Sequence, residues 1–364
     1  MGRGGSGALD VNVLAPPGSA SAVDARVEAR LGDAVARLRA LDPSAWDTGL
    51  SPAGALAAWT AAIDALAAPG AARELRGIAP SVLAVIGSAN VFTAPLEWMA
   101  GAWARGVRVR VKPASGQEAI VHAMAGCLPD GEGTHAVEVH AYAGGDAVAE
   151  RALVAGTEAV LAFGGAEALT AIAARLPTGV RFFPLGPQFG LIAVEALDVT
   201  NADGIARDHA LHDGRGCMSP AAIVTLRADL DVLDAAMHAM DLALPPGPIA
   251  PDEATARRTR DLLARVVGST RPRVLSLPVS RFSPLALSRR AVVHVVRDWD
   301  EARVALAPYL GLVGTIASSS DSAASLGVTV GRGGARLCAP GEMQTPPACR
   351  WHDGQDVWAD LWSS

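Results

Sequence analysis

Lysine is almost absent from this sequence. Lys112 is the single lysine among 31 basic residues in a chain of 364, and all the other basic residues are arginine. Acidic residues outnumber basic ones, so the formal net charge of −6 provides no positive field to attract nucleic acid or an anionic membrane. Aromatic residues make up only 4% of the chain, whereas half of it is hydrophobic and 19% is charged. This balance excludes a disordered polypeptide and predicts a compact globular protein.

Cysteine is also scarce. The four cysteines, at positions 127, 217, 338 and 349, are too few for a disulfide scaffold in a chain of this length. Cys338, Cys349 and His352 do not follow a zinc-ligand spacing, so we expect no metal site. The first residues, MGRGGSGALD, lack the apolar core of a signal peptide. These features together predict a cytoplasmic protein.

One weakly charged stretch, residues 79–104, resembles a membrane span because Glu97 is its single charge. We interpret it instead as a buried strand over 81–87, a polar turn, and a helix over 95–106.

Short apolar runs alternate with helical stretches after about residue 78. Strands are expected over 81–87, 107–111, 135–142, 158–163 and 179–186, and again over 190–196, 221–228, 273–279 and 291–298. Helices are expected over 21–41, 51–68, 95–106, 117–125, 201–214 and 228–241. This alternation predicts two α/β domains, each with a mostly parallel sheet that carries helices on both faces.

Cys217 is the first candidate for chemistry. It lies in HDGRGCMSPAAIVTL, between the end of an expected helix and the start of an expected strand. Ligands meet reactive groups at such loops in α/β sheets, and a thiol there can act as a nucleophile if its surroundings favour the thiolate. A buried, inert cysteine is the alternative.

Asn90, Lys112 and a glycine pair follow three other expected strands. The Asn90 amide can donate to a developing oxyanion, although a helix cap or turn residue is an equal alternative. Lys112 ends its strand before Pro113, where a compact ammonium can reach a ribose hydroxyl or phosphate. The alternative is that this single lysine has been retained by chance. Gly164 and Gly165 permit close approach of a phosphate, but this signal is weak alone.

Taken in chain order, these features resemble the aldehyde dehydrogenase superfamily. They are the strand leading to Asn90, the Lys112-Pro113 strand end, Phe163-Gly164-Gly165, LGPQFGLIAVEALDV and the cysteine loop. The resemblance implies two Rossmann-like three-layer α/β/α domains with the active site in the cleft between them. It also implies an N-terminal helical segment over 1–78, a nicotinamide cofactor domain over 79–191, a catalytic domain over 192–330 and a C-terminal segment over 331–364.

The resemblance also implies roles for single residues. Cys217 would be the nucleophile, and the Asn90 amide and the Cys217 backbone N–H would hold the oxyanion. Lys112 would contact the adenosine ribose of the nicotinamide cofactor. The rest of the cofactor site would be formed by Pro113, Ser115, Phe163, Gly164 and Gly165.

Two departures from the superfamily pattern narrow the expected reaction. Its usual members have Glu-Leu-Gly-Gly ahead of the cysteine, and this chain has Pro-Leu-Gly-Pro at residues 184–187. Without that glutamate, a thioester on Cys217 would be reduced to an aldehyde rather than hydrolysed. Many NAD-preferring members also have glutamate three residues after the lysine, where this chain has Ser115. We therefore expect NADP(H) to be favoured over NAD(H).

Residues 80–354 are similar to the LuxC-type acyl-CoA reductase family, most clearly in ARDHALHDGRGCMSPAAIVTL, GLVGTIASSS and the WHDG at 351–354. This similarity implies an acyl-CoA or acyl-protein thioester as substrate, an acyl-transferring partner protein and a homo-oligomer. Two alternatives stay open. A γ-glutamyl-phosphate type reductase would use a basic residue such as Arg215 for a substrate carboxylate. A non-catalytic dinucleotide-binding module would have lost turnover altogether.

Overall fold

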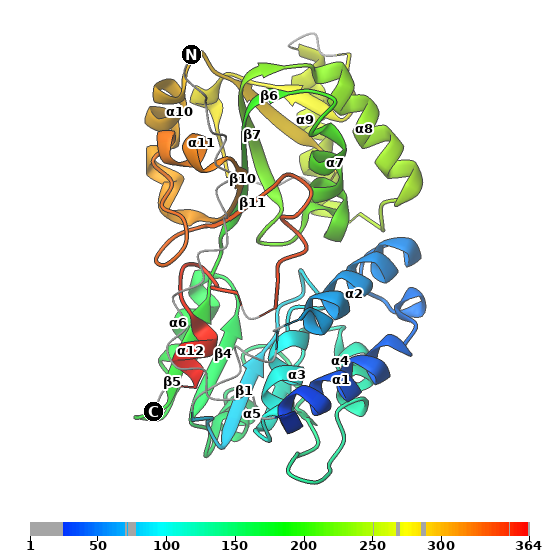
Figure 1. Ribbon diagram of the computed structural model, residues 1–364, viewed down its shortest axis with the longest axis vertical. Helices are drawn as coiled ribbons and strands as arrows, with labels where there is room; N and C mark the ends of the chain where they lie inside the picture. The colour runs from blue at the N-terminus through cyan, green and yellow to red at the C-terminus, as the bar shows by residue number, and fades with distance from the viewer. Residues whose placement is uncertain are drawn as a thin grey trace, which may run out of the picture.

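The computed structural model describes residues 25–69, 71, 78–249, 251–266, 270–284, 289–348 and 350–362. Expectations for residues 1–24, including the start of the first helix, and for Cys349 therefore lie outside the described residues. Two sheets, of five and six strands, lie one above the other in Figure 1, and all their strand pairs are parallel. The α/β class with two Rossmann-like domains is thus confirmed.

The first sheet has the strand order β3-β2-β1-β4-β5. Its strands are β1 (Val82–Ile86), β2 (Arg108–Lys112), β3 (Glu138–Val139), β4 (Ala159–Phe163) and β5 (Arg181–Leu185). β1 and β4 are buried at nearly every position, as central parallel strands are. β3 is much shorter than the strand expected over 135–142, because it lies at the sheet edge with exposed neighbours. The chain order reverses between β1 and β4, so the carboxyl ends of these strands form the crevice where ligands bind in such sheets.

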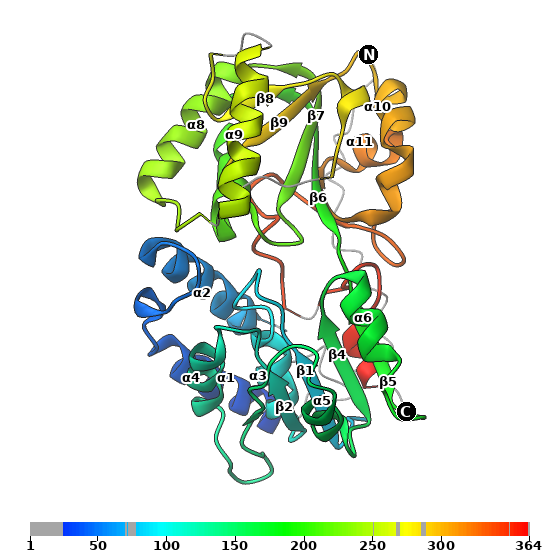
Figure 2. The same cartoon turned by 180° about the vertical axis from the view of Figure 1, so that it is seen from behind.

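Helices cover both faces of the first sheet, and two more pack beside it (Figures 1 and 2). They are α1 (Ala25–Arg39), α2 (Pro52–Ala67), α3 (Leu96–Ala104), α4 (Glu118–Gly126), α5 (Ala147–Val154) and α6 (Ala166–Ala173), with a 3-10 turn η1 (Pro43–Ala45). α2 begins where Ser51 accepts a hydrogen bond from the Gly54 N–H and Pro52 occupies the first turn. Within the described residues, none of the helices has the length and apolar character needed to cross a membrane.

The second sheet has the order β11-β10-β6-β7-β9-β8. Its strands are β6 (Phe189–Leu197), β7 (Pro220–Ala228), β8 (Val274–Ser276), β9 (Ala291–Val295), β10 (Val313–Ser318) and β11 (Arg336–Cys338). Its helices are α7 (Ala202–Ala210), α8 (Leu230–Ala243), α9 (Pro251–Val266), α10 (Trp299–Leu306) and α11 (Ser320–Ser325), with 3-10 turns η3 (Leu211–Gly214), η4 (Val279–Arg281) and η5 (Ala307–Leu312). β6 begins three residues before position 192, where the catalytic domain was expected to start. β11 belongs to the expected C-terminal segment 331–364 but pairs within this sheet. The domain boundaries themselves stay a prediction.

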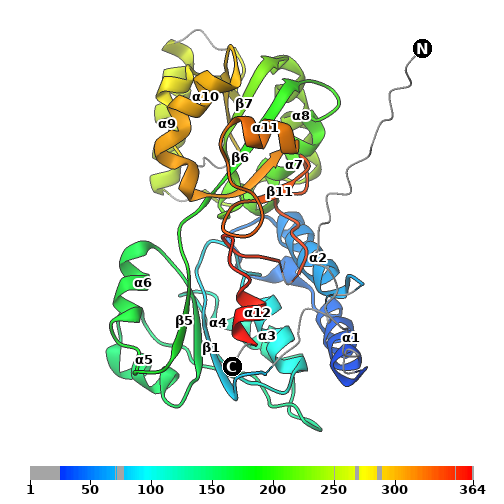
Figure 3. The ribbon, with the colours of Figure 1, turned by 60° about the vertical axis from the view of Figure 1, so that its left-hand side comes forward.

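The chain then returns to the first domain. After β11, residues 339–348 and 350–356 run back across the space between the sheets, and α12 (Val357–Leu361) docks beside α3 (Figure 3). Trp358 stacks on Trp98 of α3 with ring centroids 4.4 Å apart, and both side chains are fully buried. Arg181 of β5 donates to the backbone carbonyls of Asp360 and Leu361. The two domains are therefore joined twice, by the short β5–β6 connection and by this return segment.

Candidate active site

A cavity of about 1120 Å³ opens between the two domains, and residues of both domains and of the return segment line it. Among the residues expected to act in the site, it is lined by Cys217, Asn90, Phe163, Gly164 and Gly165. Lys112, Pro113 and Ser115 lie outside its wall, at the carboxyl end of the neighbouring strand β2.

The cysteine loop is a tight turn between η3 and β7. His212 and Asp213 adopt left-handed backbone conformations (φ 58° and 54°), which end the expected 201–214 helix early and turn the chain toward the cavity. The Gly216 N–H donates to Ser219 Oγ at 3.0 Å, and the Ser219 N–H donates back to the Gly216 carbonyl at 2.9 Å. Cys217 lies at the tip of this turn and is exposed to the cavity.

A second group of residues, which sequence reasoning missed, is hydrogen-bonded to this loop and to the helix before it. Gln344 Nε2 donates to Ser219 Oγ at 2.6 Å. The Asp208 carboxylate of α7 accepts from the backbone N–H groups of Gly341 and Met343 at 2.6 and 2.9 Å. Burial raises the pKa of Asp208 to about 6, although those N–H groups act in the opposite direction. The return segment is thereby tied to the element that carries Cys217.

The surroundings of Cys217 act on its thiol in opposite directions. Cys217 is exposed to the cavity, but the protein around it removes much of the water from its thiol. This desolvation and the negative charge of Asp353 raise the pKa of the thiol. Arg350 and the backbone N–H groups of Cys217 and Met218 lower it, but the net pKa is raised. The raised pKa favours the thiol over the thiolate in the resting cysteine.

Asn90 is exposed to the cavity in the turn after β1. The next helix, α3, starts at Leu96 with Pro95 before it and has no side-chain cap, so Asn90 is not a helix cap. The described residues give its side chain no hydrogen-bond partner. Its amide is therefore available to a ligand in the cavity.

Lys112 is buried at the end of β2, where its ammonium lies 5.5 Å from the centre of the Tyr142 ring. The pKa of Tyr142 is raised to about 12, first by burial and then by the carboxylates of Glu150 and Asp146, so the ring stays neutral. The Lys112 carbonyl accepts from the Gly87 N–H at 2.9 Å, which ties the ends of β1 and β2 together. Lys112 is thus held against the Tyr142 ring at the carboxyl end of β2.

The glycine pair opens α6 at the wall of the cavity. Gly165 is the N-cap residue and has no side chain to satisfy the first N–H groups of the helix. A Cβ at Gly165 would meet nothing within 4 Å, and one at Gly164 would lie 3.5 Å from Ala168. An open, uncapped helix N-terminus beside a sheet switch point is the environment that a dinucleotide phosphate requires. The residues present therefore fit a nicotinamide cofactor.

Charged residues of the return segment form part of the cavity wall and were not anticipated. Arg350 Nη1 lies 3.0 Å from Glu97 Oε2 of α3, and His352 Nε2 lies 2.7 Å from Glu97 Oε1. Burial opposes ionisation of Glu97, but Arg350 and His352 outweigh it and lower the pKa of this carboxyl to about 2. Asp353 follows in the same wall.

Arg215, next to the cysteine loop, joins the two domains. Its guanidinium donates to the carbonyls of Gly49 and Pro248 at 2.6 and 2.7 Å and pairs with Glu253 at 3.2 Å.

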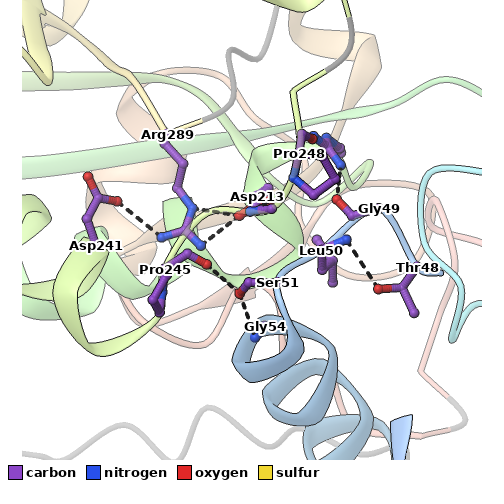
Figure 4. Close-up of polar contacts among 12 residues, drawn as sticks. Thr48, Gly49, Leu50, Ser51, Gly54, Asp213, Asp241, Pro245, Pro248 and Arg289 are labelled. Carbon is purple, nitrogen blue, oxygen red and sulfur yellow. Dashed lines mark hydrogen bonds and ion pairs between the residues drawn. The ribbon is translucent and has the colours of Figure 1, made fainter. Parts of the chain in front are cut away.

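One further contact crosses the same junction, and a buried ion-pair cluster lies beside it within the second domain (Figure 4). Ser51 donates to the Pro245 carbonyl across the domains, and Arg289 is held between the carboxylates of Asp213 and Asp241. The N-terminal end of α2 is thereby bonded to the α8–α9 connection, and Asp213, in the turn that leads into the cysteine loop, is paired with Arg289.

Comparisons with known proteins agree with this architecture. Residues 83–245 match the acyl-CoA reductase (LuxC) family. A benzaldehyde dehydrogenase from Corynebacterium glutamicum, described as NAD-dependent, has a similar crystal structure, with 16% identity, a TM-score of 0.63, and 84% of this chain and 79% of that chain covered. No curated protein matches the sequence.

Two other crystal structures are similar in the same way. For an acetylating aldehyde dehydrogenase from Geobacillus thermoglucosidasius, the identity is 12%, the TM-score 0.60, and the coverage 91% of this chain and 86% of that chain. For aldehyde dehydrogenase 21 from Physcomitrella patens, in complex with the reaction product succinate, the identity is 14%, the TM-score 0.66, and the coverage 90% of this chain and 81% of that chain. The resemblance seen in the sequence is confirmed at this level: the chain has the aldehyde dehydrogenase fold, and residues 83–245 are similar to the LuxC acyl-CoA reductases.

Proposed function

We propose that this protein is an NADPH-dependent reductase that converts an acyl thioester, from acyl-CoA or an acylated protein, into an aldehyde through a covalent thioester on Cys217. The observation that carries the proposal is that Cys217 and the unpartnered Asn90 amide line one cavity. Leu185, Gly186 and Pro187 line it too, in the stretch where the superfamily pattern has its water-activating glutamate. A thioester formed there lacks that glutamate and survives long enough to be reduced.

In the first step the Cys217 sulfur attacks the acyl carbon, and the donor's thiolate departs. The Asn90 amide and the Cys217 backbone N–H donate to the oxyanion that forms, and fixed donors of this kind lower the barrier by roughly 3–4 kcal/mol each. A bound nicotinamide cofactor would supply the hydride that turns the acyl carbon into an aldehyde. Release of the aldehyde returns Cys217 to its resting state.

The residues proposed for the cofactor lie along the carboxyl edge of the first sheet. The uncapped N-terminus of α6 at Gly164-Gly165 would hold a phosphate, and Lys112 would reach the adenosine ribose. Ser115 is exposed and uncharged, which leaves a 2′-phosphate unopposed and favours NADP(H).

The rival acyl-phosphate reductase needs a free cation for the carboxylate of its substrate. Arg215, the residue considered for that role, already bonds two backbone carbonyls and Glu253. Arg350, the other arginine in the cavity wall, is paired with Glu97. These pairings favour a thioester substrate. An acyl-transferring partner and a homo-oligomer remain expectations from the family.

Intact-protein mass spectrometry tests the proposal without cofactor. Wild type mixed with a panel of acyl-CoAs should gain one acyl mass, and Cys217→Ala should gain none. Cys338→Ala is the matched control, because this second thiol lies on β11 and burial raises its pKa to about 11, which keeps it unreactive. NADPH should then discharge the adduct as aldehyde. No adduct from any acyl-CoA would contradict the proposal and support the non-catalytic module or another acyl donor.

A further inference from the structure

Asp353 occupies an unusual place in the cavity wall. It adopts a left-handed backbone conformation, φ 51°, which is rare outside glycine and is found at functional sites when the surroundings hold it. Here a tight turn holds it, because His352 and Gln355 exchange backbone hydrogen bonds of 2.9 and 2.8 Å across it. The turn presents the Asp353 side chain to the same cavity as Cys217.

The fold leaves room for this carboxylate. A Cβ on Gly314, in β10, would lie 3.3 Å from Asp353 Oδ1 and 2.9 Å from the Gln188 side chain. A larger residue at position 314 would crowd the Asp353 carboxylate. The absence of a side chain at Gly314 therefore leaves room for the carboxylate beside the cavity.

Asp353 differs from the other carboxylates of the cavity wall. Glu97 is paired with Arg350 and His352, and Glu253 is paired with Arg215. Asp353 has no hydrogen-bond or ion-pair partner within the described part of the chain. An unpaired carboxylate in such a position is free to exchange a proton.

Few charged or titratable groups act on Asp353 from within the described part of the chain. Arg350 is the nearby cation and Cys217 the nearby thiol, and they come from the return segment and the cysteine loop. Gln188 and Gly314, which approach Asp353 from the β5–β6 connection and β10, carry no charge. His352 is bonded to Glu97 instead, and its pKa is lowered by burial and Arg350. Burial raises the pKa of Asp353 to about 6, against the opposing effect of Arg350. Asp353 and Cys217 are electrostatically coupled, since the Asp353 charge raises the pKa of the thiol.

We propose that Asp353 is the proton shuttle for acylation of Cys217. As the sulfur attacks the acyl carbon, the Sγ proton passes to the Asp353 carboxylate, the sulfur–carbon bond forms, and the bond between the acyl carbon and the donor's sulfur breaks. The same proton then passes from Asp353 to the departing thiolate. Nothing is oxidised or reduced, and Asp353 ends in its starting state. This inference rests on the proposed thioester chemistry and names a further catalytic residue for it.

The test compares two rates that respond in opposite directions to Asp353→Asn. Removing the charge lowers the pKa of Cys217, so alkylation by iodoacetamide at pH 7 should become several-fold faster. Acylation by octanoyl-CoA, followed by rapid-quench mass spectrometry without cofactor, should become on the order of 100-fold slower because the shuttle is lost. A purely structural role would change both rates in the same direction.

Controls separate the outcomes. Asp300→Asn, which removes an exposed carboxylate of α10, should change neither rate. Asp353→Glu keeps a carboxylate and should retain an acylation profile that rises with an apparent pKa near 6, as in wild type; this comparison still decides the question if Asp353→Asn does not fold.

Three results would overturn the inference. They are acylation of Asp353→Asn at the wild-type rate, a wild-type profile with no step near pH 6, and an acyl adduct that survives longer in Asp353→Asn, which would make Asp353 a hydrolytic base. Failure of wild type itself to form an adduct would refute the proposed function and this inference with it.

Discussion

Replacing Glu97 with glutamine should destabilise the protein by ~3 kcal/mol at neutral pH. The Glu97 carboxylate joins α3 to the return segment through Arg350 and His352, and both Glu97 and Arg350 are only 15% exposed. These partners lower the pKa of Glu97 from its usual 4.5 to about 2 in the folded protein, despite its burial. Each pKa unit corresponds to about 1.4 kcal/mol, which gives the expected loss.

The sign of the pH dependence follows from the lowered pKa. The pKa of Glu97 in the folded protein lies below its pKa in the unfolded chain. The stabilisation is therefore fully present above about pH 5 and is lost as the pH falls toward 2. Urea unfolding followed by tryptophan fluorescence should show a difference between wild type and Glu97→Gln that shrinks to roughly half by pH 3.

Asp33→Asn is the control, because it breaks an exposed pair with Arg37 on α1 and should cost less than about 1 kcal/mol. A difference for Glu97→Gln that is independent of pH, or no larger than that of the control, would refute the reasoning.

Two further predictions concern the cysteine loop and the cofactor. Ser219→Ala removes the oxygen that accepts from the Gly216 N–H and from Gln344 Nε2. Acylation of Cys217 should therefore slow by about 10-fold, whereas Ser318→Ala on β10 should leave the rate unchanged. Ser115→Glu places a carboxylate beside the expected 2′-phosphate. It should weaken NADPH binding about 10-fold in a fluorescence titration and leave NADH unaffected, and equal weakening of both would contradict the assignment.

The central strands could be predicted from sequence because parallel strands buried on both faces form uninterrupted apolar runs. β1, β4 and β7 begin within one residue of their expected positions. β10 was missed because Gly314 and Thr315 interrupt its apolar run, and β11 was missed because it has only three residues. α9 was not predicted because the helical pattern of its charged surface was not recognised.

The residues of the candidate site could likewise be predicted only in part. Cys217, Asn90 and Gly164 could be singled out because each follows or precedes a recognisable strand. The partners of the return segment could not, since His352 is 255 residues from Glu97 and Gly341 is 133 residues from Asp208. No local pattern encodes a hydrogen bond across such separations. The roles of Cys217, Asn90, Lys112 and the glycine pair stay predictions until they are tested.

The return segment has a consequence for the order in which the chain folds during synthesis. The strands of the second sheet are contiguous in sequence, from Phe189 to Cys338, so that domain can close its core as soon as it leaves the ribosome. The first domain is translated earlier, but its core includes Trp358 and Trp362, which emerge after the whole second domain. Until then the face of α3 that carries Trp98 lacks the cover of α12, and exposed apolar surface of this kind is prone to aggregation. The half of the protein that is made first is therefore the half that is finished last.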